Sequence, residues 1–371
     1  MPASAVDCVQ PALQHARDQL FRPFRFGQWS RLALVGFLAA ELHTSSCNFN
    51  GFNLPGNSHP RRANEFAASP LPFGHLDPAR IGQFVVLIIA FVMLAIVLGI
   101  IFLYIGSVFR FILFDSVLKK HCSISEGWHR WHRAGRRYFL WQIVLLVAEC
   151  LLLGVLIGVP LALAAALGWF NNAGQHIARS VLGVIFLIGL FLVFILLAAA
   201  VQLLSKDFLV PIMALEDVDF ANGWSRLLIM MRPEPGRYVV YLLLKVVLAI
   251  AAAVIFGILT LVPIVVLVVP AALAVFAGYK AGIGWNVTTV SLAIVFGTML
   301  FVGLMYLVAL INVPASVFFP AFAIYFFASR YPKLDALLNP APPAPELPPV
   351  PIIDTPPPEP PPFPPAPEAI G

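Results

Sequence analysis

The sequence has few charged residues. Asp, Glu, Lys and Arg make up 11% of its 371 residues, whereas a soluble domain has about 25%. Hydrophobic residues reach 60%, more than the interior of a soluble fold of this length accommodates, while a bilayer accepts apolar side chains on the outside of a helical bundle. The composition therefore excludes an ordinary soluble domain and predicts an all-α integral membrane protein.

The sequence also lacks the motifs of familiar enzymes. It has no Walker loop, no G-x-S-x-G, no H-E-x-x-H and no paired C-x-x-C. Its four cysteines, Cys8, Cys47, Cys122 and Cys150, fall in segments that we expect at different depths, so they do not suggest a disulfide framework. Cys122 has His129 and His132 nearby, but a fourth metal ligand is missing. We expect no enzymatic activity, no catalytic residue, no cofactor and no metal site.

Five apolar runs are long enough to cross a bilayer, which takes about 20 helical residues. They cover residues 83–106, 138–161, 181–204, 238–262 and 287–311. Residues 29–43 form a weaker sixth candidate, because Arg31 and Glu41 leave only a short stretch without charge. The sequence thus predicts about six transmembrane helices. Pro160, Pro263 and Pro270 lie in or just after these runs and predict helix breaks.

The distribution of Lys and Arg predicts the orientation. If six spans alternate across the membrane, 16 of these residues outside the spans lie on one side and five on the other. The richer side of a bacterial inner-membrane protein is cytoplasmic, so both termini are expected in the cytoplasm. Because the basic residues adjoin apolar spans, we do not expect nucleic acid as a partner.

An internal repeat links the two long connections on this side. Each connection contains Gly-Trp-x-Arg followed by Arg-Tyr, and a four-residue insertion containing Pro233 and Pro235 lengthens the second. The copies begin at Gly127 and Gly223, and their Arg-Tyr pairs begin at Arg137 and Arg237. Ser123 and Asp219 precede them as N-cap residues. We predict two parallel repeats of span, cytoplasmic interfacial helix and span, with the indoles toward lipid.

Three domains follow from these patterns. Residues 1–28 are expected to form a cytoplasmic amphipathic segment, with Val9, Leu13, Ala16 and Leu20 at helical spacing. Residues 29–334 form the helical transmembrane domain, with repeat units at about 82–170 and 179–285. Residues 315–327 are too apolar to be solvated. Residues 335–371 are rich in proline and predict a disordered cytoplasmic tail, which acts as a spacer or displays a proline-rich partner motif.

Two kinds of candidate site emerge. Glu149 and Lys245 are the ionisable residues deepest in the spans and occupy similar positions in the two repeats, so they either form an intramembrane ion pair or are accommodated separately, with Lys245 reaching the interface. A second set is basic and lies in the two connections. It either binds anionic headgroups or only orients the chain, and consists of Arg130, Arg133, Arg136, Arg137, Arg226 and Arg237.

The chain resembles the membrane domain associated with glycerophosphoryl diester phosphodiesterases, in bacterial multi-pass proteins of unknown function. The resemblance rests on PFRFGQWSRLALVGFLA, GWHR, GWSR, DFLVPIMALED and VPASVFFPAFAIYFFASRYPKL. The catalytic barrel of the phosphodiesterase has no counterpart here, so the resemblance implies no activity.

Two functions remain open. The first is a permease-like or transport-associated role that uses a polar site between the repeat units. The second is a membrane scaffold or lipid-interacting role that uses the basic interfacial helices. Expected partners are membrane lipids, including anionic headgroups, and a second copy of the chain or another membrane protein.

Overall fold

The computed structural model describes residues 3–39, 78–166, 177–282 and 286–339, and in these segments it is α-helical with no strand. Five helices are long and apolar enough to cross a membrane, as an all-α membrane protein requires. They are α4 (Pro78–Leu118), α5 (Ile124–Ala166), α6 (Ile177–Leu204), α9 (Pro235–Lys280) and α10 (Val287–Ile311). The proline-rich tail, residues 340–371, lies outside the described residues.

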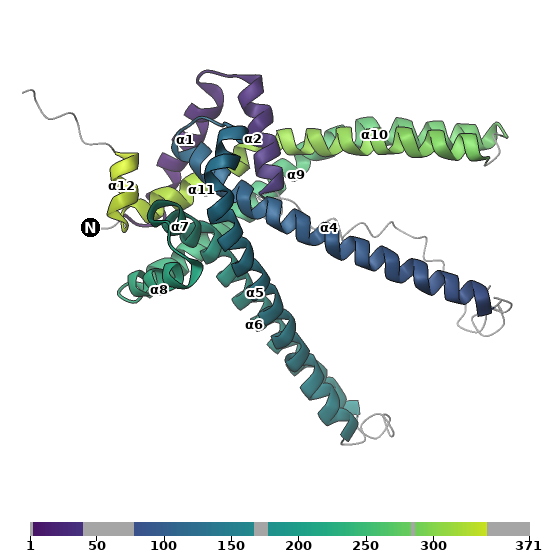
Figure 1. Ribbon diagram of the computed structural model, residues 1–371, viewed down its shortest axis with the longest axis horizontal. Helices are drawn as coiled ribbons and strands as arrows, with labels where there is room; N and C mark the ends of the chain where they lie inside the picture. The colour runs from purple at the N-terminus through teal and green to yellow at the C-terminus, as the bar shows by residue number, and fades with distance from the viewer. Residues whose placement is uncertain (1–2, 40–77, 167–176, 283–285, 340–371) are drawn as a thin grey trace, which may run out of the picture.

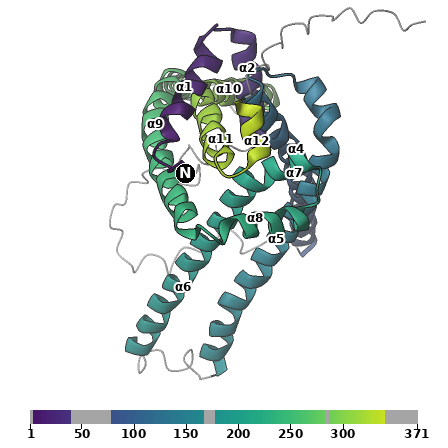
Figure 2. The same cartoon turned by 90° about the vertical axis from the view of Figure 1, so that its left-hand side faces the viewer.

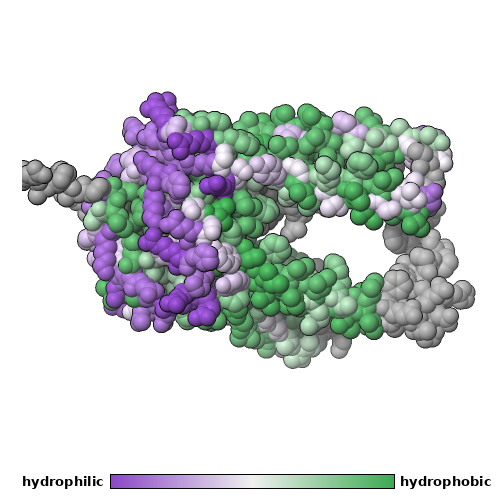
Figure 3. Space-filling model, turned by 45° about the horizontal axis from the view of Figure 1, so that its top comes forward, coloured by the Kyte–Doolittle hydropathy of each residue, from purple (hydrophilic) through white to green (hydrophobic). Residues whose placement is uncertain are grey.

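The molecule consists of a body from which apolar arms project (Figure 1). The arms are α4 alone, the pair α5 and α6, and the pair α9 and α10. In four of these helices the most apolar 18-residue window contains no buried residue, which is typical of helices whose surroundings are lipid. Figure 3 shows hydrophilic residues gathered over the body and hydrophobic residues over the arms.

Each long helix belongs to both parts of the molecule. In α4, residues 85–102 are exposed, whereas residues 107–109 and most of the turns that follow are buried. In α5 the order is reversed, with buried positions up to Leu145 and mostly exposed ones beyond it. In α4 and α5 the exposed part therefore has about the length of a bilayer span, and the remaining turns belong to the body.

The centre of the body is α11 (Val313–Ala328), which Figure 2 shows surrounded by the other helices. Phe322, Phe326 and Phe327 are fully buried, together with Phe208 and Tyr241 from other elements. Rings of Tyr241 and Phe326 stack with centroids 4.5 Å apart. The expectation that residues 315–327 avoid solvent is confirmed, because this helix is the apolar core. The short α12 (Pro332–Leu338) follows it.

The N-terminal helices also belong to the body. In α1 (Val9–Phe21), Ala16 and Leu20 are buried, but Leu13 is 61% exposed. The buried His15 hydrogen bonds the Val117 carbonyl of α4 through Nε2 over 2.9 Å. The predicted amphipathic helix is present, with one side packed against α11 and hydrogen bonded to α4. Its location at the membrane interface stays a prediction.

The weak sixth span does not appear as a span in the described residues. α2 (Phe26–Leu38) has only 13 residues and packs in the body against α4, α10 and α11. Its length is about 20 Å, short of the roughly 30 Å of hydrocarbon. The remainder of this candidate and the connection up to residue 77 lie outside the described residues.

The two predicted interfacial helices differ in structure. The first is not separate, since α5 runs without a break from Ile124 through the arm. The second is α8 (Phe220–Met231), which ends before Pro233 and is followed by α9. The proline-containing insertion lies in this break: Pro233 follows the end of α8, and Pro235 is the first residue of α9, where a proline costs no backbone hydrogen bond. The expected breaks at Pro160, Pro263 and Pro270 are wrong, since α5 and α9 continue through them.

Candidate functional site

Three helical segments meet around a small cavity in the body. α4 contributes Arg110, Leu113 and Phe114, and α11 contributes Pro320, Ala323 and Ile324. Asp207, Val210 and Pro211 come from η3 (Ser205–Leu209) and α7 (Val210–Glu216), which continue α6. Each segment presents positions i, i+3 and i+4, one face of a helix. The cavity has a volume of about 30 Å³, enough for about one water molecule.

Asp207 and Lys245 form a buried ion pair beside this cavity. Lys245 Nζ lies 2.6 Å from Asp207 Oδ1 and 2.5 Å from Oδ2, and both side chains are 4% exposed. Tyr241 donates its hydroxyl to Oδ2 over 2.8 Å. The carboxylate is thus satisfied on both oxygens, as a buried charge requires.

Asp207 lies in a π-helical turn. Residues 205–209 form η3, where the hydrogen bonding changes from the α to the π pattern. A π turn adds one residue to a helix and is frequent at functional sites. In this protein the π turn lies where the chain passes from the arm helix α6 into the body, and it contains the buried carboxylate of Asp207.

A second polar network lies on the α4 side of the cavity. Arg110 Nη1 donates to the Tyr138 hydroxyl over 2.8 Å, and its Nε donates to the Ala39 carbonyl over 3.3 Å. Gln142 Nε2 donates to the same hydroxyl over 2.9 Å. Three charged residues line the cavity, Arg110 from α4 and Lys206 and Asp207 from η3, so both signs of charge border the same small volume.

The predicted pair of Glu149 and Lys245 is not formed. Lys245 pairs with Asp207, and Glu149 accepts a 3.3 Å hydrogen bond from Gln202 Nε2 of α6. The two residues share a similar depth, but α5 and α9 extend into different arms (Figure 1). Asp207 was missed because it follows the end of an apolar run and resembles a loop residue. A lysine inside an apolar run was the available signal that an acid lies nearby.

The six predicted lipid-binding arginines divide into two groups. Arg130, Arg133 and Arg136 are exposed on α5, on the side away from its buried residues. Arg130 lies over the ring of Trp131, 5.0 Å from its centroid. Within the described part of the chain, no ion pair engages these three guanidinium groups, so they form an open basic face.

The other three arginines are paired within the chain. Arg137 binds the Asp217 carboxylate over 2.8 Å and the Asp219 carboxylate over 3.1 Å. Arg226 pairs with Glu216, and Arg237 pairs with Glu234 over 3.4 Å. Because acids already neutralise them, these arginines are weaker candidates for lipid phosphate. Asp219 precedes α8 as predicted, but its carboxylate binds Arg137 instead of capping the helix.

The indoles of the repeats pack against the protein. Trp131 stacks on Phe111 with centroids 5.9 Å apart, and Trp128 lies 6.0 Å from Phe109. Trp224 lies 5.6 Å from Trp141. The expectation that the indoles face lipid is wrong for Trp131, which is buried against α4, while Trp128 and Trp224 are half-buried against aromatic side chains.

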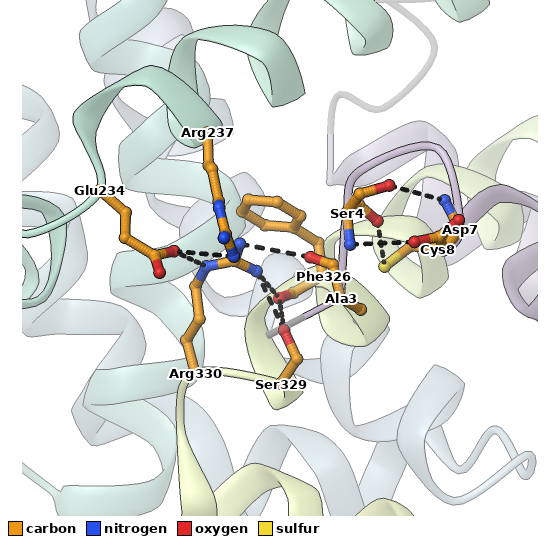
Figure 4. Close-up of polar contacts among 9 residues, drawn as sticks. All are labelled: Ala3, Ser4, Asp7, Cys8, Glu234, Arg237, Phe326, Ser329 and Arg330. Carbon is orange, nitrogen blue, oxygen red and sulfur yellow. Dashed lines mark hydrogen bonds and ion pairs between the residues drawn. The ribbon is translucent and has the colours of Figure 1, made fainter. Parts of the chain in front are cut away.

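Arg330 joins three parts of the body, as Figure 4 shows. Its guanidinium donates to the carbonyls of Phe326 over 3.0 Å and Ala3 over 3.3 Å, and lies 3.5 Å from Glu234. It also lies over the Phe326 ring, 4.1 Å from the centroid. Arg330 thus connects the N-terminal segment, the start of α9 and the end of α11. In the sequence it appeared only as one of the residues that set the orientation.

Residues 3–337 match a family of unknown function, DUF7544. The chain belongs to this family. The match includes every helix of the body and all five arm helices, apart from the last residue of α12, and it ends before the proline-rich tail. No curated protein and no solved structure matches the chain. The family has no assigned activity, and the resemblance to the membrane domain associated with glycerophosphoryl diester phosphodiesterases stays a prediction.

Proposed function

We propose that this DUF7544 protein is a non-enzymatic, lipid-interacting scaffold of the bacterial inner membrane. Its body lies on the cytoplasmic side, with both termini, and the basic face of α5 binds anionic headgroups. The first repeat unit supplies α4 and α5, and the second supplies α6 and α9. The expected partners are anionic lipids and, through the apolar arms, other membrane helices.

The observation that supports this proposal is the different state of the six arginines. Arg130, Arg133 and Arg136 are exposed and have no acidic partner in the described part of the chain, while the other three are paired. A guanidinium near the membrane surface attracts anionic lipid by about 1 kcal/mol. Since α5 continues into an arm, this face is attached directly to a membrane-embedded helix.

The position of the remaining basic residues supports the orientation. In the described segments only Arg80, Arg179 and Lys280 lie near the ends of the arms, and the other Lys and Arg residues lie in the body. The excess of positive charge at the body is the pattern of a cytoplasmic face.

The test is the lipid that co-purifies with the full chain. The triple variant Arg130→Glu, Arg133→Glu, Arg136→Glu should lose anionic lipid, by roughly fivefold for each arginine before screening by salt. Quantitative mass spectrometry of extracted lipid provides the measurement. Arg226→Gln is the control, because Arg226 is already paired with Glu216 and glutamine can still donate a hydrogen bond to that carboxylate, and it should leave the lipid content unchanged. Unchanged lipid in the triple variant would contradict the proposal and leave these residues an orienting role.

Permease-like activity is the second candidate, and the buried Asp207–Lys245 pair in a π-helical turn favours it. Buried ionisable residues in membrane proteins often lie on ion or solute pathways. The adjacent cavity has room for about one water molecule, so transport would require a second conformation. Proteoliposomes that become permeable to protons or small ions, and lose this on Asp207→Asn, would favour transport over the scaffold.

A further inference from the structure

An apolar groove runs between α1, α9 and α11, away from the basic face of α5. Its volume is about 730 Å³, within the roughly 300–1,000 Å³ typical of small-molecule sites. Leu13 and Leu20 line it from α1, and Ala252 and Phe256 line it from α9. Phe318 lines it from α11. The groove is therefore walled by hydrocarbon and aromatic side chains on all three helices.

Small residues explain why the groove is open. α9 presents Ala251 and Ala252, and α11 presents Ala315, so little side-chain volume fills the space between these helices. α1 packs closely on α11 through Ala12 and Ala16, both buried. Leu248 of α9 is half-buried against the core, whereas Ala251 and Ile255 are exposed along the groove.

One charged residue lies at this groove. Arg17 is exposed and is the charged residue among the described residues that line it. Leu13, Arg17 and Phe21 follow at i, i+4 and i+8, so the guanidinium lies in line with two apolar side chains on one face of α1. No carboxylate belongs to the described lining, so the site combines an apolar wall with one uncompensated positive charge.

This combination fits an amphiphile with an anionic head. We propose that the groove binds an anionic phospholipid, with one acyl chain along α9 and the phosphate on Arg17. A guanidinium can donate two parallel hydrogen bonds to one phosphate group, which fixes its position as well as neutralising its charge. The lipid enters from the bilayer, because α9 is itself one of the membrane-spanning helices.

The experiment uses the full chain in nanodiscs containing traces of phosphatidylglycerol with a photoactivatable acyl chain. After illumination, mass spectrometry identifies the cross-linked peptides. We expect cross-links to residues 248–256 of α9 and to α1. Ala252→Phe fills the groove and should remove them, whereas Ala272→Phe, an exposed alanine on the arm of the same helix, should not. Equal yields in the two variants would overturn the proposal.

The role of Arg17 is tested with two headgroups. Arg17→Gln should lower cross-linking by phosphatidylglycerol about fivefold, the effect of one basic residue at a membrane surface. It should leave cross-linking by a photoactivatable diacylglycerol, which has no phosphate, unchanged. Loss of both signals, or of neither, would show that the groove does not recognise an anionic head. Melting temperatures of the variants confirm that each is folded.

Lipid binding in the groove and lipid binding at the basic face of α5 can fail independently of each other. The Arg130, Arg133 and Arg136 variant should keep its groove cross-links even if its total anionic lipid falls, because α5 does not line the groove. Loss of the groove cross-links in that variant would show that the phospholipid binds through α5, and would overturn the separate site.

Discussion

At the scale of single residues, the ion pair between Asp207 and Lys245 is the feature with the largest expected energetic effect. Removing one member should destabilise the protein by about 3–5 kcal/mol, because the other charge stays buried without a partner. Asp207→Asn and Lys245→Met should both show this loss in thermal unfolding of the purified protein. The double variant should recover much of it, since neither charge is then present.

A second pair of variants provides the control for the comparison of single and double variants. Glu149→Gln and Lys245→Met should have additive effects, because Glu149 hydrogen bonds Gln202 and shares no partner with Lys245. Additive losses in the Asp207 and Lys245 double variant would instead show that the two charges do not depend on each other.

His15 should make the stability of the body depend on pH. Burial lowers the pKa of His15 below its ordinary value of 6.5, and nearby Lys120 lowers it further, although the Val117 carbonyl and Asp18 oppose the shift. The unfolded chain then takes up the proton more readily than the folded one. The stabilisation is complete above about pH 6.5 and is lost as the pH falls from there toward the folded pKa.

The melting temperature measured between pH 8 and pH 5 tests this dependence. His15→Leu should melt with a smaller decrease over this range than the wild type, because the proton-binding group is gone. His132→Gln is a suitable control, since His132 is exposed. If the His15 variant loses stability on acidification as steeply as the wild type, other groups are responsible.

Only one member of the Asp207–Lys245 pair could be predicted from the sequence. Lys245 stood out because a lysine is costly inside an apolar run. Asp207 could not be predicted as its partner, because the two residues are brought together only by the packing of η3 against α9. Periodicity gives the face on which a residue lies but not which helix is opposite. For the same reason, the sequence predicted lipid binding for all six arginines. The structure distinguishes the three that pair with acidic residues from the three that do not.

At the scale of elements, the crossing of α4 and α5 depends on a glycine. A methyl group at Gly135 would lie 2.6 Å from Cγ2 and 2.9 Å from Cα of Val108. Because a backbone atom cannot rotate away, the two helices must separate. Gly135→Ala should therefore cost about 1–3 kcal/mol in thermal or denaturant unfolding.

Gly154 is the matched control on the same helix. A methyl group there has no neighbour within 4 Å among the described residues. Gly154→Ala should be neutral or slightly stabilising, because alanine favours the helix. A loss equal to that of Gly135→Ala would place a helix, from this chain or another, against the arm.

The element boundaries that could not be predicted have a common cause. An apolar run of 13 to 16 residues suits either a short span or a buried helix, and both α2 and α11 turned out to lie in the body. The long runs were predicted well, because a stretch of 20 or more apolar residues has few alternatives. The continuity of α5 was missed because an N-cap signal fits the start of a long helix as well as a short one.

At the scale of the whole molecule, the orientation can be measured by cysteine labelling in intact cells. After replacement of the native cysteines, a cysteine at Ser58, which lies outside the described residues, should react with an impermeant maleimide. A cysteine at Ser225, exposed on α8, should stay unlabelled until the membrane is opened. The reverse pattern would place the body outside the cytoplasm.

The continuity of α4 has a mechanical consequence. This helix runs for 41 residues, about 60 Å, with no proline after its first position. One end lies in the bilayer, and the other carries Arg110 and Phe114 to the central cavity. A rod of this kind cannot tilt at one end alone. Tilting is one way in which a helix that is too long for the hydrocarbon layer accommodates the difference. A change in membrane thickness that tilts α4 therefore also moves Arg110 and Phe114 at the cavity.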